Sequence, residues 1–369
     1  MIVGILKEIK PQENRVCMTP SGVDMMKAHG HKVFVEKNAG LGSGFDDAQY
    51  LDAGAQILDT PEEIYKVSDM VMHVKEPQPS EFAYIREGQI VFTYLHLAAD
   101  KDLTQALLKT GSTGIAYETI EDDKGGLPLL APMSEVAGRL AAQQGAKYLE
   151  KPFGGRGVLL GGVTGTQRAN VLVIGGGVVG TQAAEVACGM GADVTILDMN
   201  IDRLRYLSEI MPANCQALMS SPSLIKELVK TSDLVIGAVL VAGAKAPKLI
   251  TRDMLATMKK GAVIVDVAID QGGCFETSHP TTHNDPVYEI DGVIHYCVAN
   301  MPGAVPLTST MALTNATLPY AIKIADMGWK AACRDKGFAK GINYVGNELV
   351  CKPVAEAFGF DYTPLDSLI

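Results

Sequence analysis

The sequence lacks the features that mark membrane proteins and nucleic-acid-binding proteins. No uncharged stretch approaches the roughly 20 apolar residues that a membrane span needs. The first residues, MIVGILKEIKPQ, reach a charge at Lys7 instead of forming a secretory leader. The formal net charge is −10, and no cluster of lysine and arginine offers a face to nucleic acid. We therefore expect a soluble, cytoplasmic protein with no membrane or nucleic-acid partner.

Cysteine and histidine are too scattered to indicate a metal site or a disulfide framework. The seven cysteines form no C-x-x-C pair, and their odd number favours reduced thiols. A nucleophilic thiol at Cys274 or Cys297 is an alternative, although neither has a basic partner beside it. No metal is expected, and five histidines are interpreted as surface or packing residues: His29, His31, His73, His283 and His295.

The length of 369 residues is too great for one ordinary core, so two domains are expected. Short apolar stretches alternate with helix-start signals such as Thr19-Pro20 and Thr60-Pro61, which indicates parallel strands connected by helices. In the first part of the chain we predict strands at 3–6, 32–36, 70–74, 90–95 and 113–120, and a helix at 101–109. In the second part we predict strands at 170–175, 193–198, 233–239, 262–267 and 294–300.

Two long helices are predicted to connect the two series. The loop at 122–133 contains glycines and two prolines and marks a domain boundary. Ser134 is expected to cap the first long helix, at 134–150, and the second spans 309–333 before a short helical tail. The predicted fold class is α/β, with two doubly wound Rossmann-like domains, the second inserted into the first. The predicted bounds are 1–133 with 306–369 for the first domain and 134–305 for the second.

A glycine fingerprint opens the second series. Gly175-x-Gly177-x-x-Gly180 follows a β-branched strand and precedes an alanine-rich helix, and the next strand ends on Asp198, about 20 residues later. This context predicts a dinucleotide site with the pyrophosphate at the helix N-terminus. A carboxylate at the position of Asp198 accepts from the ribose hydroxyls and repels a 2′-phosphate, so the predicted cofactor is NAD and not NADP. The alternative is a tight strand–helix turn without a ligand.

Three charged or ionisable side chains follow strands of the first series. Arg15 lies in a polar loop, Lys75 follows the strand at 70–74, and His96 ends the apolar stretch VFTYLH, which is typical of a buried strand. Taken singly, Arg15 and Lys75 could be solvated surface charges and His96 a hydrogen-bonded core histidine. Parallel strands bring their carboxyl ends to one sheet edge, where a guanidinium can hold a carboxylate, an ammonium can polarise a carbonyl and an imidazole can move protons.

The chain resembles the family that alanine dehydrogenases share with the N-terminal, NAD-binding part of the proton-pumping nicotinamide nucleotide transhydrogenase. The matching stretches cover nearly the whole length: GILKEIKPQENRVCMTP, VKEPQPSE, TYLHLAAD, MSEVAGRLAAQQGA, GGRGVLLGGV, IGGGVVG, VDVAIDQGGCFE and VANMPGAVPLTSTMALTNATLPY. The resemblance implies reversible oxidative deamination of L-alanine to pyruvate and ammonia with NAD, and an active form that is a homohexamer.

The resemblance also implies roles for individual residues. It assigns the substrate carboxylate to Arg15 and the substrate oxygen to Lys75, and it makes His96 and Asp270 the catalytic pair. Met133 is an expected substrate contact, with an ordinary core position as the alternative. The fingerprint, the strand ends and the resemblance together predict the NAD contacts Ser134, Gly175, Gly177, Val178, Val179, Gly180, Asp198, Arg203, Ser220, Val239, Leu240, Val267, Ala268, Ile269, His279, Val298, Ala299, Asn300 and Met301.

Two positions depart from the family pattern. Members often carry an arginine where this chain has His279, near the cofactor, and a basic residue where it has Leu307. Two other functions share much of the pattern: the NAD-binding module of a proton-translocating transhydrogenase, and a non-catalytic NAD-sensing protein. The joint presence of His96 and Asp270 favours the dehydrogenase.

Overall fold

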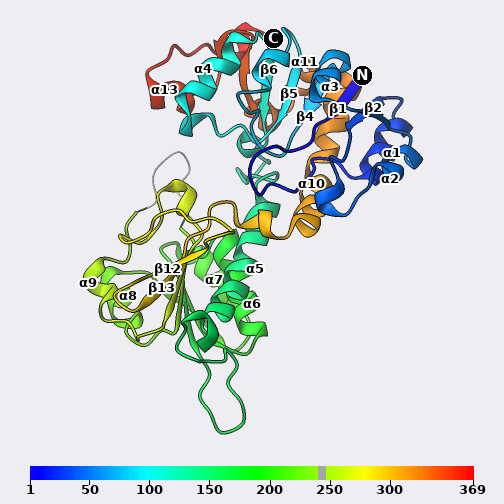
Figure 1. The fold of residues 1–369 in the computed structure, drawn as a ribbon. Helices are drawn as coiled ribbons and strands as arrows, with labels where there is room; N and C mark the ends of the chain where they lie inside the picture. Colours follow the sequence, from blue (N-terminus) through cyan, green and yellow to red (C-terminus); the bar gives the residue numbers. More distant parts are fainter. Residues whose placement is uncertain (240–246) are drawn as a thin grey trace. The chain divides into compact units, whose positions relative to one another are not determined.

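The computed structural model describes residues 1–239 and 247–369, so the predicted NAD contact Leu240 lies outside the described residues. The chain divides into two compact units: Met1–Met133 with Val305–Ile369, and Ser134–Ala304 (Figure 1). We refer to them as the first and the second unit. Each is built on one largely parallel sheet, and the prediction of a doubly wound α/β fold is confirmed. In the described part of the chain, no helix is long and apolar enough to cross a membrane.

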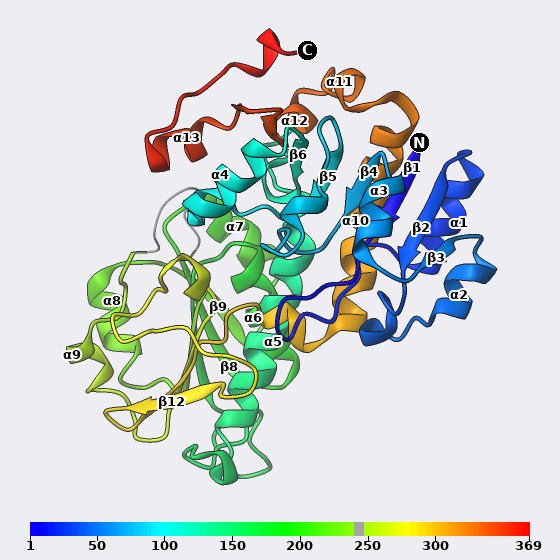
Figure 2. The ribbon, with the colours of Figure 1, turned by 45° about the horizontal axis from the view of Figure 1, so that its top comes forward.

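The sheet of the first unit has the strand order β15-β14-β6-β5-β4-β1-β2-β3. Strands β1 to β6 are parallel, and Figure 2 shows β1, β2 and β3 side by side in blue. The hairpin of β14 and β15 joins β6 in antiparallel orientation. The strands are β1 (Ile2–Ile5), β2 (Lys32–Glu36), β3 (Gln56–Leu58), β4 (Met70–Met72), β5 (Ile90–Thr93), β6 (Thr113–Ala116), β14 (Ile342–Val345) and β15 (Glu348–Leu349).

Local capping explains where the helices of the first unit begin. The Thr19 side chain accepts from the backbone N–H of Gly22 and is followed by proline, and Thr60 forms a capping box with Glu63. The helices are α1 (Pro20–Ala28), α2 (Asp47–Asp52), α3 (Pro61–Val67), α4 (Lys101–Lys109), α10 (Pro306–Met327), α11 (Trp329–Ala332), α12 (Lys336–Ala339) and α13 (Lys352–Phe358). The 3₁₀ turns are η1 (Leu41–Ser43), η2 (Phe82–Tyr84), η3 (Leu97–Ala99), η4 (Tyr117–Thr119) and η8 (Leu365–Ser367).

The sheet of the second unit has the strand order β12-β13-β11-β10-β7-β8-β9; β12 pairs with β13 in antiparallel orientation, and the other described pairs are parallel. The strands are β7 (Asn170–Ile174), β8 (Asp193–Asp198), β9 (Cys215–Met219), β10 (Leu234–Gly237), β11 (Val263–Asp266), β12 (Val287–Ile290) and β13 (Val293–Tyr296). The helices are α6 (Val178–Gly189), α7 (Ile201–Ile210), α8 (Pro222–Leu228) and α9 (Arg252–Leu255), and the turns are η5 (Lys151–Phe153), η6 (Ile269–Gln271) and η7 (Met301–Ala304). Strands β10 and β11 are buried along their whole length, as expected for central parallel strands.

Three predictions about the connecting segments are wrong in detail. Helix α5 (Ala131–Tyr148) begins three residues before Ser134, because proline is well suited to the first turn of a helix and Pro132 supplies it. The second long helix ends at Met327, where Gly328 adopts a positive φ of 76°. The tail is not only helical, since β14 and β15 extend the first sheet.

Candidate functional site

The strand order reverses at one point in each sheet, and the predicted site residues follow the strands at that point or their neighbours. In the first unit the reversal lies between β1 and β4. Arg15 is in the loop after β1, Lys75 comes three residues after β4, and His96 three residues after β5. In open α/β sheets, ligands bind at this switch point, beyond the carboxyl ends of the strands.

Arg15 is a buried, paired cation, so its interpretation as a solvated surface charge is wrong. Its side chain is 2% exposed and that of Glu13 is 0% exposed. Nε donates to Oε1 of Glu13 at 2.6 Å, and Nη2 donates to Oε2 at 2.5 Å. Nη1 lies 3.0 Å from the sulfur of Met133. Burial alone would lower the pKa of Arg15, but Glu13 outweighs it and raises this pKa above its usual value.

A buried charge network fixes the backbone of the segment that carries Lys75. Oε1 of Glu8 accepts the backbone N–H of Val74 at 2.6 Å and that of Lys75 at 3.3 Å. His73 lies between Glu8 and Glu81, at 3.2 Å and 3.1 Å. Of the two interpretations of His73, the surface one is wrong: the side chain is packed in the core and paired with both carboxylates. Lys75 itself is half-buried, and its carbonyl accepts from the hydroxyl of Thr93 at 2.8 Å.

His96 is exposed, whereas its apolar sequence context predicts burial. Strand β5 ends at Thr93, and the His96 side chain is 44% exposed. Its backbone is left-handed, with φ 50° and ψ 33°, a region that few non-glycine residues adopt. The backbone N–H donates to Oε1 of Glu118 at 2.6 Å, and the ring stacks on Tyr94 with centroids 5.7 Å apart.

Glu76 and Lys10 also contact this site, and sequence reasoning missed both. Oε2 of Glu76 lies 3.7 Å from Nδ1 of His96, and Oε1 is hydrogen-bonded to Nζ of Lys10. Burial opposes ionisation, but the contacts with His96 and Lys10 outweigh it and lower the pKa of Glu76 to about 2. The available signal was the adjacency of Glu76 to Lys75 in the stretch VKEP.

The fingerprint glycines of the second unit have the geometry of a phosphate-binding turn. Gly175 has a φ of 106°, and a Cβ atom there would lie 2.7 Å from the carbonyl oxygen of Ala238. A Cβ on Gly180 would lie 1.8 Å from the carbonyl oxygen of Gly175, so helix α6 could not pack as it does. Beyond its neighbours in the chain, a Cβ on Gly177 would have no atom of residues 1–239 and 247–369 within 4 Å. Open space at Gly177, ahead of the N-terminus of α6 at Val178 and Val179, fits a pyrophosphate.

Two backbone N–H groups hold the carboxylate of Asp198 at the end of β8. Its Oδ2 accepts the backbone N–H of Gly176 and its Oδ1 that of Asn200, both at 2.8 Å. Arg203 braces the same turn, since Nε donates to the carbonyl oxygen of Gly176 and Nη2 donates to the Thr181 hydroxyl at 2.6 Å. The carboxylate keeps acceptor capacity toward ribose hydroxyls, and the residues present fit NAD.

The remaining predicted NAD contacts lie at later strand ends of the second unit. Val239 follows β10, Val267 follows β11, and the Ser220 N–H donates to the carbonyl of Asp198 at 2.8 Å. Ala268 and Ile269 are buried, with 6% and 3% of each whole residue exposed. Asp270, the next residue, is exposed in η6.

The loop after β13 carries a second left-handed residue among the predicted contacts. Asn300 has a φ of 61°, and its carbonyl accepts from Nε2 of His283 at 3.1 Å. Side chains at neighbouring positions are buried or half-buried: Val298, Ala299 and Met301. His279 is exposed and stacks on Tyr288 with centroids 3.7 Å apart. Ser134 lies half-buried inside α5.

The thiols near this loop are not activated nucleophiles. Burial raises the pKa of the Cys274 thiol to about 12 and that of Cys297 to about 11. Within 1–239 and 247–369, the cysteines are all free, and no group of acidic, histidine and cysteine side chains could hold a metal ion.

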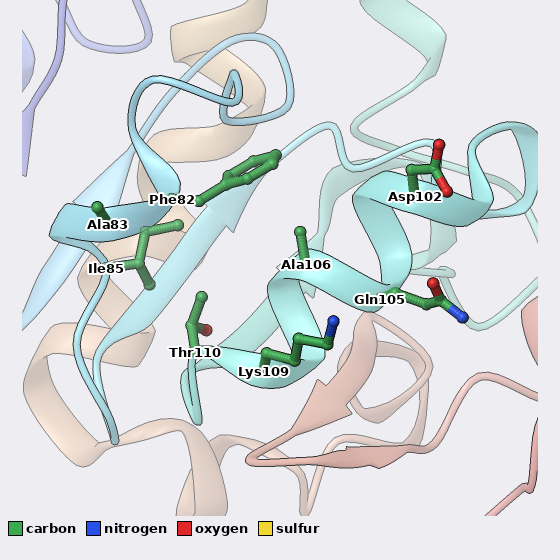
Figure 3. Close-up of a pocket in the computed structure, with 8 residues that line it drawn as sticks. All are labelled: Phe82, Ala83, Ile85, Asp102, Gln105, Ala106, Lys109 and Thr110. Atoms are coloured by element: carbon green, nitrogen blue, oxygen red, sulfur yellow. The ribbon is translucent and has the colours of Figure 1, made fainter.

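A surface depression of about 640 Å³ lies apart from these residues in the first unit (Figure 3). It runs between η2 and α4, and Phe82, Asp102 and Lys109 are among the residues that line it. None of the predicted site residues belongs to it, and we assign it no part in the chemistry.

Comparison with known proteins places the whole chain in one family. Residues 4–137 match the family model for the N-terminal domain of alanine dehydrogenase/PNT, and residues 141–352 match the model for its C-terminal domain. Alanine dehydrogenase of Staphylococcus saprophyticus subsp. saprophyticus is 55% identical over 371 residues, covering 100% of both chains. The Bacillus subtilis enzyme is 54% identical, covering 100% of this chain and 98% of its own.

Two solved structures show the same likeness. One described as L-alanine dehydrogenase has a TM-score of 0.94 and 50% identity, covering 97% of this chain and 99% of its own. A transhydrogenase from Sinorhizobium meliloti has a TM-score of 0.82 and 25% identity, covering 95% and 99%.

Proposed function

The chain belongs to the alanine dehydrogenase/PNT family, and we propose that it catalyses the reversible oxidative deamination of L-alanine to pyruvate and ammonia with NAD. It is an NAD-dependent oxidoreductase that acts on a CH–NH₂ donor. The observation that carries the residue assignments is the position of Arg15 and Lys75 after β1 and β4, the two strands at the switch point of the first sheet, with His96 after the neighbouring strand β5. We assign substrate binding to residues 1–133 and 306–369 and NAD binding to residues 134–305.

Arg15 and Lys75 hold the substrate in this proposal. Glu13 holds Nε and Nη2 of the Arg15 guanidinium and fixes its plane, and Nη1 lies beside Met133. We assign the substrate carboxylate to this oriented guanidinium. Lys75, on the segment anchored by Glu8, donates to the oxygen of pyruvate. A planar cation with a fixed orientation positions a carboxylate more accurately than a flexible one, which lowers the entropic cost of reaching the reactive geometry.

The second unit binds the cofactor through its backbone and one carboxylate. The N-terminus of α6 meets the pyrophosphate in the open space at Gly177, and Asp198 accepts from the adenosine ribose. When bound, NAD supplies the acceptor for the hydride that leaves Cα of alanine. Arg203 stabilises the glycine turn through its hydrogen bonds to the Gly176 carbonyl and the Thr181 hydroxyl. Its role in this proposal is structural support of the phosphate site.

His96 and Asp270 complete the reaction by moving protons. Loss of hydride leaves an iminium carbon on the substrate, which water attacks. The exposed carboxylate of Asp270 orients that water and accepts its proton, and His96 transfers protons as the carbinolamine collapses to pyruvate and ammonia.

The decisive experiment is NADH formation by the purified chain after addition of L-alanine and NAD. We expect NADH with L-alanine and none with D-alanine, because a substrate bound through Arg15, Lys75 and His96, which follow three different strands, has one orientation of its Cα hydrogen. A chain that binds NADH but forms none from L-alanine would contradict the activity and favour an NAD-binding module. The assembly that we propose is a homohexamer, for which light scattering of the purified protein is the test.

A further inference from the structure

The carboxylate of Glu76 lies between two basic groups at the edge of the first sheet. Its Oε1 is bonded to Nζ of Lys10, and its Oε2 faces Nδ1 of His96 at 3.7 Å. The Glu76 side chain is only 14% exposed, and the contacts with His96 and Lys10 lower its pKa to about 2 in spite of that burial. Glu76 is therefore an anion at neutral pH. The proton transfers assigned to His96 and Asp270 do not involve it.

The backbone and ring of His96 are held in one orientation. Its left-handed backbone is unfavourable for an L-residue and is stabilised by the bond from its N–H to Glu118 at 2.6 Å. Its ring stacks on Tyr94 with an interplanar angle of 29°. In this orientation one ring nitrogen, Nδ1, faces Glu76. The other nitrogen, Nε2, lies on the opposite side of the imidazole.

We propose that Glu76 is a positioning residue that keeps a proton on Nδ1 of His96, so that Nε2 is the atom that exchanges protons with the substrate, and that Lys10 holds Glu76 in place. The inference rests on the proposed function, since it concerns the proton step of that reaction. The hydrogen-bond partner of one imidazole nitrogen determines which nitrogen carries the proton of the neutral ring. A carboxylate at Nδ1 also stabilises the imidazolium that forms when Nε2 accepts a proton.

The distance of 3.7 Å is longer than a direct hydrogen bond. Catalytic contacts are often long in the free enzyme and shorten when the charged intermediate forms. The other ionisable groups around His96 do not take this role. Glu118 is occupied by the backbone N–H groups of Leu95 and His96, and burial raises the pKa of Tyr94, which stays a neutral phenol.

The first test reads the protonation state of the ring directly and does not depend on activity. In protein labelled with ¹⁵N-histidine, we expect neutral His96 to carry its proton on Nδ1, with His96→Asn identifying its signals. Free imidazole in histidine favours the proton on Nε2, so the expected result differs from the default. In Glu76→Gln the Nδ1–H form should lose its preference. An Nε2–H ring in the unmodified protein would overturn the inference, even if Glu76→Gln failed to fold.

The second test measures how the deamination rate depends on pH when the negative charge of Glu76 or the positive charge of Lys10 is removed. Deamination needs unprotonated His96, so its rate should rise with pH. Glu76→Gln removes a negative charge and should move the midpoint of that rise to lower pH by about one unit. Lys10→Gln removes a positive charge and should move it to higher pH. Turnover of Glu76→Gln should fall about tenfold or more, while KM for NAD stays unchanged, and Glu76→Asp should recover part of the loss.

A matched control is Asp59→Asn. Asp59 is an exposed carboxylate of the same unit that pairs with Lys37 at 2.9 Å, and the change removes the same charge away from His96. Its pH profile should coincide with that of the unmodified protein. Equal midpoints for Glu76→Gln and Asp59→Asn in an active enzyme would refute the role of Glu76. An unmodified protein inactive on L-alanine would instead refute the proposed function, and the NMR result would still decide the tautomer.

Discussion

Nδ1 of His73 lies 3.2 Å from Oε1 of Glu8, and both side chains are almost completely buried. The same imidazole lies 3.1 Å from Glu81, and the Tyr65 hydroxyl lies 3.2 Å from its Nε2. Burial alone would lower the pKa of His73, but the charges of Glu81 and Glu8 outweigh it and raise this pKa to about 10. Because Glu8 also binds the backbone of Lys75, this network connects the stability of the sheet edge to the substrate site.

The network should make stability depend on pH in a defined window. A raised histidine pKa contributes stability that is complete below the unfolded value of about 6.5 and is lost as the pH rises through about 10. The pKa of Glu81 is lowered, so its contribution is present above the unfolded value of about 4.3 and is lost as the pH falls. Urea denaturation between pH 4 and pH 10 should therefore give the highest unfolding free energy at about pH 5–6.

His73→Leu should destabilise the protein by about 3–5 kcal/mol at neutral pH, because two buried carboxylates lose their shared partner. His29→Gln is the control, since His29 pairs with the exposed carboxylate of Asp326 and should change stability by less than about 1 kcal/mol. Equal unfolding free energies for the two variants would contradict the charged network.

Substitution of Arg15 should lower kcat/KM for the substrate and leave the affinity for NADH unchanged. Arg15→Lys keeps the charge but loses the two-point contact with Glu13, and kcat/KM for pyruvate should fall about 30- to 1,000-fold, or about 2–4 kcal/mol. Lys75→Ala should act in the same direction. NADH affinity, measured by fluorescence titration, should match the unmodified protein. A parallel loss of NADH affinity would remove Arg15 from the substrate site.

His96→Asn should separate chemistry from stability. Because the side chain is 44% exposed, truncation leaves no cavity, and asparagine tolerates the left-handed backbone. We expect an unchanged melting temperature and a turnover reduced about 10²- to 10⁴-fold. Asp270→Asn should behave alike. A variant with normal turnover would show that the imidazole is not the proton-transfer group.

Gly177→Ala and Gly180→Ala should have contrasting effects, although they lie three residues apart. A Cβ at Gly177 meets no atom within 4 Å in the part of the chain that the structure describes, its immediate neighbours apart. This variant should therefore fold normally and lose NADH affinity by occupying the pyrophosphate space. A Cβ at Gly180 would lie 1.8 Å from the carbonyl of Gly175, so the second unit should be destabilised. Thermal unfolding with and without NADH distinguishes them. Full NADH affinity in Gly177→Ala would contradict the proposed pyrophosphate position.

Asp198→Ala should narrow the preference for NAD over NADP. The carboxylate would face a 2′-phosphate, and its removal abolishes that repulsion, so the ratio of kcat/KM values should shift toward NADP by about tenfold or more. Asp193→Asn, at the opposite end of β8, removes an exposed carboxylate that pairs with Arg168 and should leave the ratio unchanged. An unmodified enzyme that used both cofactors equally would contradict the assignment of Asp198.

The sequence by itself determined the features that depend on near neighbours in the chain. Capping by Thr19 and by Thr60, the strand at 193–198 and the helix at 101–109 all appear at the predicted positions, because caps and apolar periodicity act within a few residues. The turn at Gly175 was predictable for the same reason, since its positive φ and the close approach at Gly180 follow from consecutive residues.

Only the tertiary structure decided which of these elements meet. The strand order places the ends of β1 and β4 next to each other, and no local pattern specifies that order. The burial of Arg15 against Glu13, the His73 network and the contact between Glu76 and His96 each depend on it, because charged side chains look alike in sequence whether solvated or paired. The exposure of His96 also depends on tertiary structure. An apolar stretch predicts a strand, but pairing with the neighbouring strands determines that β5 ends at Thr93, before His96.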